Sequence, residues 1–314
     1  MVIILAKIIG SIVFGLLAGC GAVFIFNRMP ASWLCDYGQR PEDNPLLAAE
    51  MRAKVRRDGD ALSVKDNERL PFDPDKEDPY YKRIKENPWR WVYSFGFMCL
   101  CLRLSLWGTA EAFTVLTPDD ASFQIMETTQ LAAAGLFACW ALLMIALSDL
   151  KYMIIPDQFV LMLALTSFGF VPFYKTPAFV TDILVSLGLP GSNNAAAGGT
   201  ADGAASLANS PIWQPIGGLI IGAGFMLLVA LLGKLFTRKE VMGFGDIKLC
   251  AALGLVLGIQ GTAIAMVLAI LAGGVIAAIG LMTGRLKKDS AMPMGPSICG
   301  SAMAYILIAM PYMI

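Results

Sequence analysis

A run of more than thirty residues without a charged side chain, from Leu249 to Met282, is the feature that most limits how this chain can fold. A bilayer is crossed by about 20 consecutive apolar residues, so the run is long enough for a transmembrane span. Over all 314 residues, 57% are hydrophobic and only 15% are charged. The charged fraction is well below the roughly one quarter that is usual in soluble domains. We therefore predict an all-α polytopic membrane protein.

Apolar runs separated by short polar stretches predict about eight transmembrane helices, the first within residues 1–27 and the other seven within a core formed by 91–314. Their approximate limits are 2–26, 91–116, 131–147, 157–174, 212–233, 247–258, 262–284 and 293–314. Arg103 and Glu111 lie inside the second run, eight residues apart and so on roughly one helix face. This pattern favours a helix that is partly interfacial or that faces a pocket. Residues 117–130 are predicted to form a short acidic loop.

Two of the connecting segments are long and differ in composition. Residues 28–90 hold 13 Lys+Arg and 13 Asp+Glu, about half of all the charge in the chain. We predict that this segment is a small water-facing domain between the first two helices. Residues 175–211 are rich in Gly, Ala, Ser and Asn, which cannot build an apolar core, and are predicted to form a mobile loop.

The distribution of positive charge predicts which side of the membrane each loop occupies. With eight spans, four loops share one side: 28–90, 148–157, 234–248 and 285–292. These loops hold 21 of the 24 Lys+Arg residues. Because cytoplasmic loops carry an excess of Lys and Arg, we predict that this side is cytoplasmic and that the loop 175–211 is extracytoplasmic.

Asp149 and Asp246 lie at the predicted cytoplasmic ends of two apolar runs. An ionisable group at such a position is costly to keep dry and is a functional candidate by default. Two carboxylates close together in a low-dielectric site cannot both ionise easily, so the pair would share one proton and could act as base and acid on one water molecule. The residues alone favour equally a second interpretation, in which both are solvated helix caps.

Gly243 and Gly245 remove two side chains next to Asp246, which permits either a positive φ or the close approach of another backbone or of a substrate. The chain has no His, which excludes His metal ligands and His-based catalytic triads. Its seven Cys include no C-x-x-C pair, so no zinc knuckle or thioredoxin-type motif is indicated. Its net charge of zero gives no indication of a nucleic-acid partner.

The stretch Asp149-x6-Pro156-Asp157, together with Gly243-Phe244-Gly245-Asp246-Ile247-Lys248, resembles the bacterial type IV prepilin peptidase family, which are intramembrane aspartyl proteases of the G-x-G-D kind. Pro293-Met294-Gly295-Pro296 is similar to the P-F-G-P stretch of the family's last helix. The resemblance covers roughly 130–314 and is poor over 31–128.

The resemblance implies that Asp149 and Asp246 are the catalytic pair of an aspartic endopeptidase. It also implies supporting roles for a second set of residues: Gly243, Gly245, Lys248, Pro156 and Asp157. The sequence Pro156-Asp157 is typical of a helix start. Lys248, two residues after Asp246, would hold the charge of that carboxylate or contact a lipid phosphate.

By resemblance, the substrates are type IV prepilins or type II secretion pseudopilins, whose short basic leader is removed at the cytoplasmic face of the bacterial inner membrane. Many family members carry two C-x-x-C pairs in the first cytoplasmic loop and also N-methylate the new amino terminus. Residues 28–90 hold only Cys35, so zinc is not expected and S-adenosylmethionine-dependent methylation is left open. Proteolysis requires neither. The remaining expected partner is membrane lipid.

Two other classes of function use the same residues. In an ion-coupled transporter, Asp149 and Asp246 would be cation ligands. In a non-catalytic scaffold for a pilus or secretion assembly, neutral replacement of either Asp would leave the assembly intact.

Overall fold

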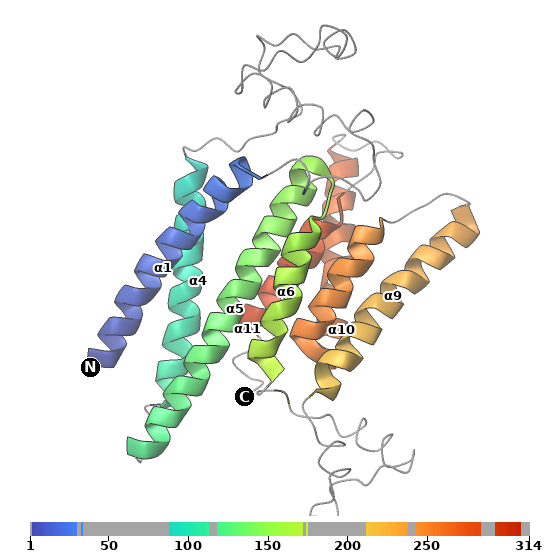
Figure 1. Cartoon of the computed structure of the whole chain (residues 1–314). Coiled ribbons are helices and arrows are strands. Elements are labelled where there is room, and N and C mark those ends of the chain that lie inside the picture. The colour runs from blue at the N-terminus through green and yellow to red at the C-terminus, as the bar shows by residue number, and fades with distance from the viewer. Residues whose placement is uncertain are drawn as a thin grey trace, which may run out of the picture.

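The computed structural model of the chain describes residues 2–29, 33, 88–112, 118–171, 174, 212–237, 243–283 and 293–308, and their side chains except at 2–7, 104–112, 118–129, 236 and 237. Seven helices account for most of these residues: α1 (Val2–Asn27), α4 (Trp89–Ala112), α5 (Pro118–Tyr152), α6 (Asp157–Phe170), α9 (Trp213–Thr237), α10 (Phe244–Met282) and α11 (Gly295–Ile308). No strand occurs within the described ranges (Figure 1). The predicted all-α polytopic membrane fold is confirmed.

Helix α10 contains a break that divides one apolar run into two antiparallel segments. Gly258 has φ 67° and ψ −173°, a backbone region that is essentially restricted to Gly. A straight helix of 39 residues would be about 58 Å long. Gly222 of α9 nevertheless lies against both Cys250 and Thr262, and Cys250 and Met266 line one small cavity. The chain therefore reverses its direction at Gly258.

Three side chains satisfy the backbone around this reversal. The amide of Ile259 donates to Oε1 of Gln214 at 3.1 Å, and the hydroxyl of Thr262 donates to the carbonyl of Gly258 at 2.6 Å. The hydroxyl of Tyr174 donates to the carbonyl of Val256. A bilayer offers no water to unpaired backbone groups, so a reversal at membrane depth needs such protein partners.

With α10 divided at Gly258, the described chain forms eight helical segments, the number predicted. Four of the helices, α1, α5, α9 and α10, contain stretches that are long and apolar enough to cross a membrane. Three segments are much shorter: α6, α11 and residues 244–257 of α10 have 14 residues each. At 1.5 Å per residue each is about 21 Å long, against about 30 Å for the hydrocarbon core of a bilayer.

The predicted acidic loop at 117–130 is wrong, because α5 begins at Pro118 and continues through that stretch to Tyr152. The reason lies in the order Pro118-Asp119-Asp120. Proline has a φ that suits the first helical position, and acidic residues in the first turn are favourable at the positive end of the helix dipole. The acidic character of the segment therefore belongs to a helix start.

The four helices α5, α6, α10 and α11 pack together as the centre of the bundle, with α9 along α10 and the α1–α4 pair attached through α4 and α5 (Figure 1). The fully buried side chains at this centre come from all four helices: Leu142, Ile145, Leu163, Leu249 and Ile306. Glycines allow the closest approaches, as where Gly218 of α9 meets Gly254 of α10.

One end of the bundle collects the C-terminal ends of α1, α5 and α9 and the N-terminal ends of α4, α6, α10 and α11; it is uppermost in Figure 1 and is called the site end below. The turn at Gly258 lies at the opposite end. Nearly all of the predicted charged domain 28–90 and all of the predicted loop 175–211 lie outside the described residues, so both stay predictions.

Candidate active site

Asp149 and Asp246 reach the site end from two different helices. Asp149 lies in the last turn of α5, and Asp246 lies in the first turn of α10. Their carboxylates are close enough to repel each other electrostatically. Residues almost a hundred positions apart in the sequence are thus brought to one place by the packing of α5, α6, α10 and α11.

Asp149 is held by a backbone donor from a third helix. Its side chain is 6% exposed, and its Oδ2 accepts a hydrogen bond from the amide of Gly295, the first residue of α11, at 2.9 Å. Amides in the first turn of a helix have no partner within the helix and bind anions readily. One carboxylate oxygen of Asp149 is therefore fixed, and the other remains available for a substrate or for water.

Gly295 is a site residue to which sequence analysis assigned no role, although it lies in the Pro293–Pro296 stretch that resembles the family's last helix. A Cβ on Gly295 would lie 2.6 Å from Oδ2 of Asp149, closer than nonbonded atoms approach. The absence of a side chain at this position is therefore a steric requirement for the bond to Asp149.

The two glycines before Asp246 have different roles, and neither has a positive φ. Gly243 caps the start of α10 with an extended backbone (φ −72°), and its carbonyl accepts from the amide of Asp246 at 3.2 Å. Gly245 provides space, since a Cβ there would lie 3.3 Å from Cβ of Ile155. Of the two alternatives left open by the sequence, the structure shows close approach at Gly245.

Below the carboxylates, away from the site end, the site is closed by two thiols. Cys250 lies one turn after Asp246 and Cys299 one turn after Gly295, and the two side chains are 1% and 0% exposed. Cys299 is close enough to interact electrostatically with both Asp149 and Asp246. This apolar floor separates the pair from the rest of the bundle interior.

Asp157 and Lys248 form an ion pair at the site end. Nζ of Lys248 lies 2.9 Å from Oδ2 and 3.0 Å from Oδ1 of Asp157, and it lies over the ring of Phe244. Pro156 is buried and caps α6 immediately before Asp157. The structure thus places the charge of Lys248 against Asp157 and links α6 to α10 across the mouth of the site. Because both side chains are about one third exposed, the pair contributes little stability.

Three of the helical segments that begin beside the site are short. Asp157, Gly245 and Gly295 all lie at the starts of segments that are about 9 Å shorter than the hydrocarbon core is thick. The other ends of these three segments lie at the Gly258 end of the bundle. If those ends are level with one surface of the hydrocarbon core, the carboxylates lie below the other surface, at the bottom of a recess. Non-helical backbone at that depth is tolerated where it lines a water-filled space.

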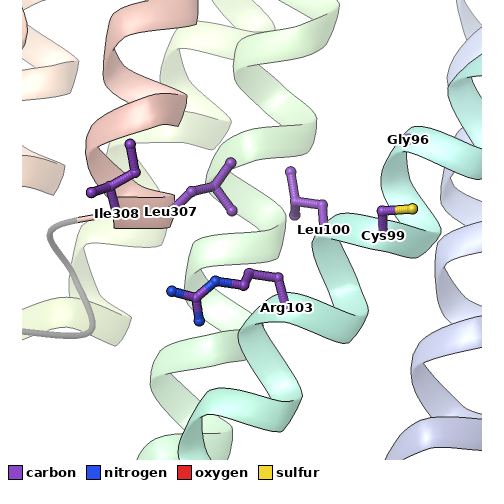
Figure 2. Close-up of a pocket in the computed structure, with 6 residues that line it drawn as sticks. All are labelled: Gly96, Cys99, Leu100, Arg103, Leu307 and Ile308. Atoms are coloured by element: carbon purple, nitrogen blue, oxygen red, sulfur yellow. The ribbon is translucent and has the colours of Figure 1, made fainter.

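One cavity lies away from the carboxylate pair. It has a volume of about 390 Å³ and opens between α4 and α11, where it is lined by Gly96, Cys99, Leu100, Arg103, Leu307 and Ile308 (Figure 2). Ile308 is 13 residues after Gly295 on α11, about 20 Å along the helix from the site. Figure 2 shows the Arg103 side chain extending from α4 toward the end of α11, as the pocket-facing alternative predicted. The side chain of Glu111 lies outside the described residues.

Among the residues that the structure describes, no group of three or more His, Cys, Asp or Glu side chains could hold a metal ion. Cys35 and most of 28–90 lie outside them, so the expectation of no zinc stays a prediction.

Residues 136–278, which contain Asp149 and Asp246, match the family model described as the type IV leader peptidase family. Three curated relatives are each named prepilin leader peptidase/N-methyltransferase. The relative from Bacillus subtilis is 38% identical over 98 residues, covering 31% of this chain and 39% of the relative. The relative from Aeromonas salmonicida is 43% identical over 89 residues, covering 27% and 30%, and that from Legionella pneumophila is 28% identical over 196 residues, covering 62% and 55%.

The aligned part of the chain spans less than two fifths of the length of the first of these relatives. No solved structure matches the chain significantly. The matches nevertheless agree with one another, and the family match includes both carboxylates of the pair together with Pro156, Asp157 and Lys248. Residues 136–278 are therefore similar to the type IV leader peptidase family, and this similar segment contains both carboxylates.

Proposed function

We propose that the protein is an intramembrane aspartic endopeptidase, with Asp149 and Asp246 as its catalytic pair. The observation that carries this proposal is the convergence of the two carboxylates at one end of the bundle, inside the segment that matches the leader peptidase family. The amide of Gly295 orients one of them, and buried thiols exclude water from below.

In this mechanism one carboxylate of the pair is ionised and the other carries a proton. The ionised group removes a proton from a water molecule held between them, and the water oxygen attacks the peptide carbonyl carbon. The protonated group donates to the carbonyl oxygen as it becomes tetrahedral. Collapse of this intermediate breaks the C–N bond, and the leaving nitrogen receives a proton from the pair.

The names of the relatives support prepilins as the substrate class. A prepilin or pseudopilin with a basic leader and an apolar segment would be cut where the charged leader must remain in water. In the proposed orientation the site end faces the cytoplasm, because 21 of the 24 Lys+Arg lie in loops on that side. The proposed membrane is the inner membrane of a bacterium, as the resemblance to the prepilin peptidase family implies. The proposal concerns peptide cleavage and leaves the methyltransferase part of the relatives' names aside.

Incubation of the purified, reconstituted protein with a panel of prepilin and pseudopilin peptides tests this function. Mass spectrometry should detect two products from at least one peptide, cut at the junction between the basic leader and the apolar segment. A protein with Asp149 and Asp246 both replaced by Asn is the control and should give neither product. Absence of cleavage across the panel by well-folded protein would contradict the proposal.

The two rival functions predict different results with the same preparations. A transporter would move cations into proteoliposomes, and the flux would depend on Asp149 or Asp246. A scaffold would support pilus or secretion assembly after Asp→Asn replacement, because near-isosteric neutral residues leave the packing in place. Cleavage without flux supports the peptidase.

A further inference from the structure

Met153 has a backbone conformation that is unusual for its residue type. Its φ is 57°, and it is the one non-glycine residue with a positive φ in the described part of the chain. Its amide donates to the carbonyl of Asp149 at 2.9 Å, which closes the C-terminal end of α5. This arrangement is the left-handed helix cap in which Gly is the preferred residue, because a Cβ is strained there.

The side chain of Met153 makes no evident packing contribution that would offset this strain. It is 59% exposed. In this type of cap, the usual stabilising contact is between two apolar residues, the capping residue and the residue four positions before it. In this chain the earlier residue is Asp149, which is polar and belongs to the catalytic pair.

Met153 also lies beside the site. The connection 153–156 begins at the carbonyl of Asp149 and continues to the contact between Ile155 and Gly245, one residue before Asp246. Three further large apolar side chains, each within two residues of a site residue in the sequence, are more than half exposed. With Met153 they form the set that we call the apolar rim: Leu150, Met153, Phe244 and Met294. Each lies on a segment that contributes a residue to the site.

We propose that the apolar rim binds the apolar segment of the peptide substrate next to the scissile bond, and that Met153 is a specificity-determining residue of the enzyme. The inference rests on the proposed peptidase function. Strained backbone persists where another requirement maintains it, and it is concentrated at functional sites. Methionine is flexible and polarisable, which suits an adaptable contact with varied apolar residues. Each rim residue is one to four positions in the sequence from Asp149, Asp246 or Gly295, and in this proposal a peptide bound by the rim presents its backbone to the carboxylates.

Substitutions at Met153 separate substrate contact from backbone strain. Met153→Gly and Met153→Asn both relieve the left-handed strain and remove the apolar side chain, since Gly and Asn tolerate this conformation. We expect the Tm to rise by about 2 °C, while KM for a leader peptide rises about tenfold. Met153→Leu keeps an apolar side chain and the strain, so KM should stay within about twofold of the wild-type value. A purely structural role would not raise stability and KM together.

Met282→Gly is the matched control, because Met282 is 87% exposed but lies in helical backbone near the end of α10. Residues 259–282 are ten longer than 244–257, so Met282 extends about 15 Å beyond the level of the site. This variant should lower the Tm and leave KM unchanged.

Binding of a fluorescent leader peptide to protein carrying Asp246→Asn gives a second measurement that does not depend on cleavage. Adding Met153→Gly should weaken binding about tenfold. Unchanged affinity would overturn the role of the rim, even if the wild-type protein cleaves the peptide. Weakened affinity without any wild-type cleavage would keep the rim as a peptide-binding surface and refute the peptidase. If Met153 contacts lipid instead, both KM and affinity will be unaffected.

Discussion

At the scale of single residues, the proposed chemistry makes Asp149 and Asp246 a single unit. If either carboxylate is removed, the one that is left can accept or donate a proton, but no partner remains to carry out the other proton transfer. Asp149→Asn, Asp246→Asn and the double variant should therefore lose similar amounts of kcat, and the losses should not add. Asp157→Asn should lose far less, because Asp157 is paired with Lys248 and lies in another helix. Substantial peptide cleavage by well-folded Asp246→Asn protein would refute the pair as the catalytic group.

The pair also determines the expected pH dependence of cleavage. Activity requires one carboxylate ionised and one protonated, so kcat/KM should be bell-shaped in pH. It should fall on the acid side as both become protonated and on the alkaline side as both become ionised. The two limbs belong to the pair and not to either residue. Rates measured across the pH range with one peptide should show both limbs, whereas a single limb would indicate only one titrating group.

Gly295 offers a test of how closely Asp149 must be held. In Gly295→Ala the new Cβ would lie 2.6 Å from Oδ2 of Asp149, so the carboxylate must move away from the amide that orients it. We expect kcat to fall by a factor of about ten or more, since small displacements of reacting groups are costly. Gly300→Ala is the matched control, because Gly300 lies on the same helix and a Cβ there meets nothing within 4 Å. Equal kcat values for the two variants would show that the Gly295 contact is dispensable.

At the scale of whole helices, the turn at Gly258 is the most constrained connection. Gly258→Ala places a Cβ in a backbone region that L-residues avoid, and 2.9 Å from Oε1 of Gln214. The free energy of unfolding should fall by about 2–3 kcal/mol. Gly274→Ala, in the same helix with open space around it, should be neutral or stabilising by about 0.5–1 kcal/mol. Unfolding of both variants by SDS titration would measure the difference, and equal stabilities would argue against strain at Gly258.

Sequence patterns predicted the helical segments well where apolar runs were bounded by Gly, Pro or charge. They located the interruption near Gly258 because polar and small residues cluster there, and the start of α6 because Pro156 precedes Asp157. They failed at Pro118, where acidic residues suggested a loop although the same residues suit a helix start.

Tertiary contacts explain what the sequence did not reveal about the site. The bond from Gly295 to Asp149 joins residues 146 positions apart, and no local pattern specifies it. For Lys248, the spacing suggested the charge of Asp246 or a lipid phosphate as its partner. The ion pair with Asp157 was not expected, because it depends on the packing of α6 against α10.

At the scale of the whole molecule, three short segments surround the site within a bundle of longer helices. A thicker bilayer would bury the start of α6, α10 and α11 more deeply, and mismatch is relieved only at a cost of fractions of a kcal/mol per Å. We expect kcat/KM in proteoliposomes to fall several-fold from myristoleoyl to erucoyl phosphatidylcholine. Protein in detergent micelles, where no fixed thickness is imposed, is the control for intrinsic activity. A constant rate through the lipid series would show that the recess does not depend on membrane thickness.

The side-chain hydrogen bonds around the reversal at Gly258 also affect how the chain is assembled during synthesis. Tyr174 and Gln214, whose side chains bond to Val256 and Ile259, both precede the turn in the sequence. A ribosome therefore completes the partners before it makes the reversal that needs them. The two segments of α10 can enter the bilayer as a hairpin that finds α6 and α9 already in place, and α11, which is made later, then brings Gly295 to Asp149. In this order of synthesis the site becomes complete only after Gly295 has been made.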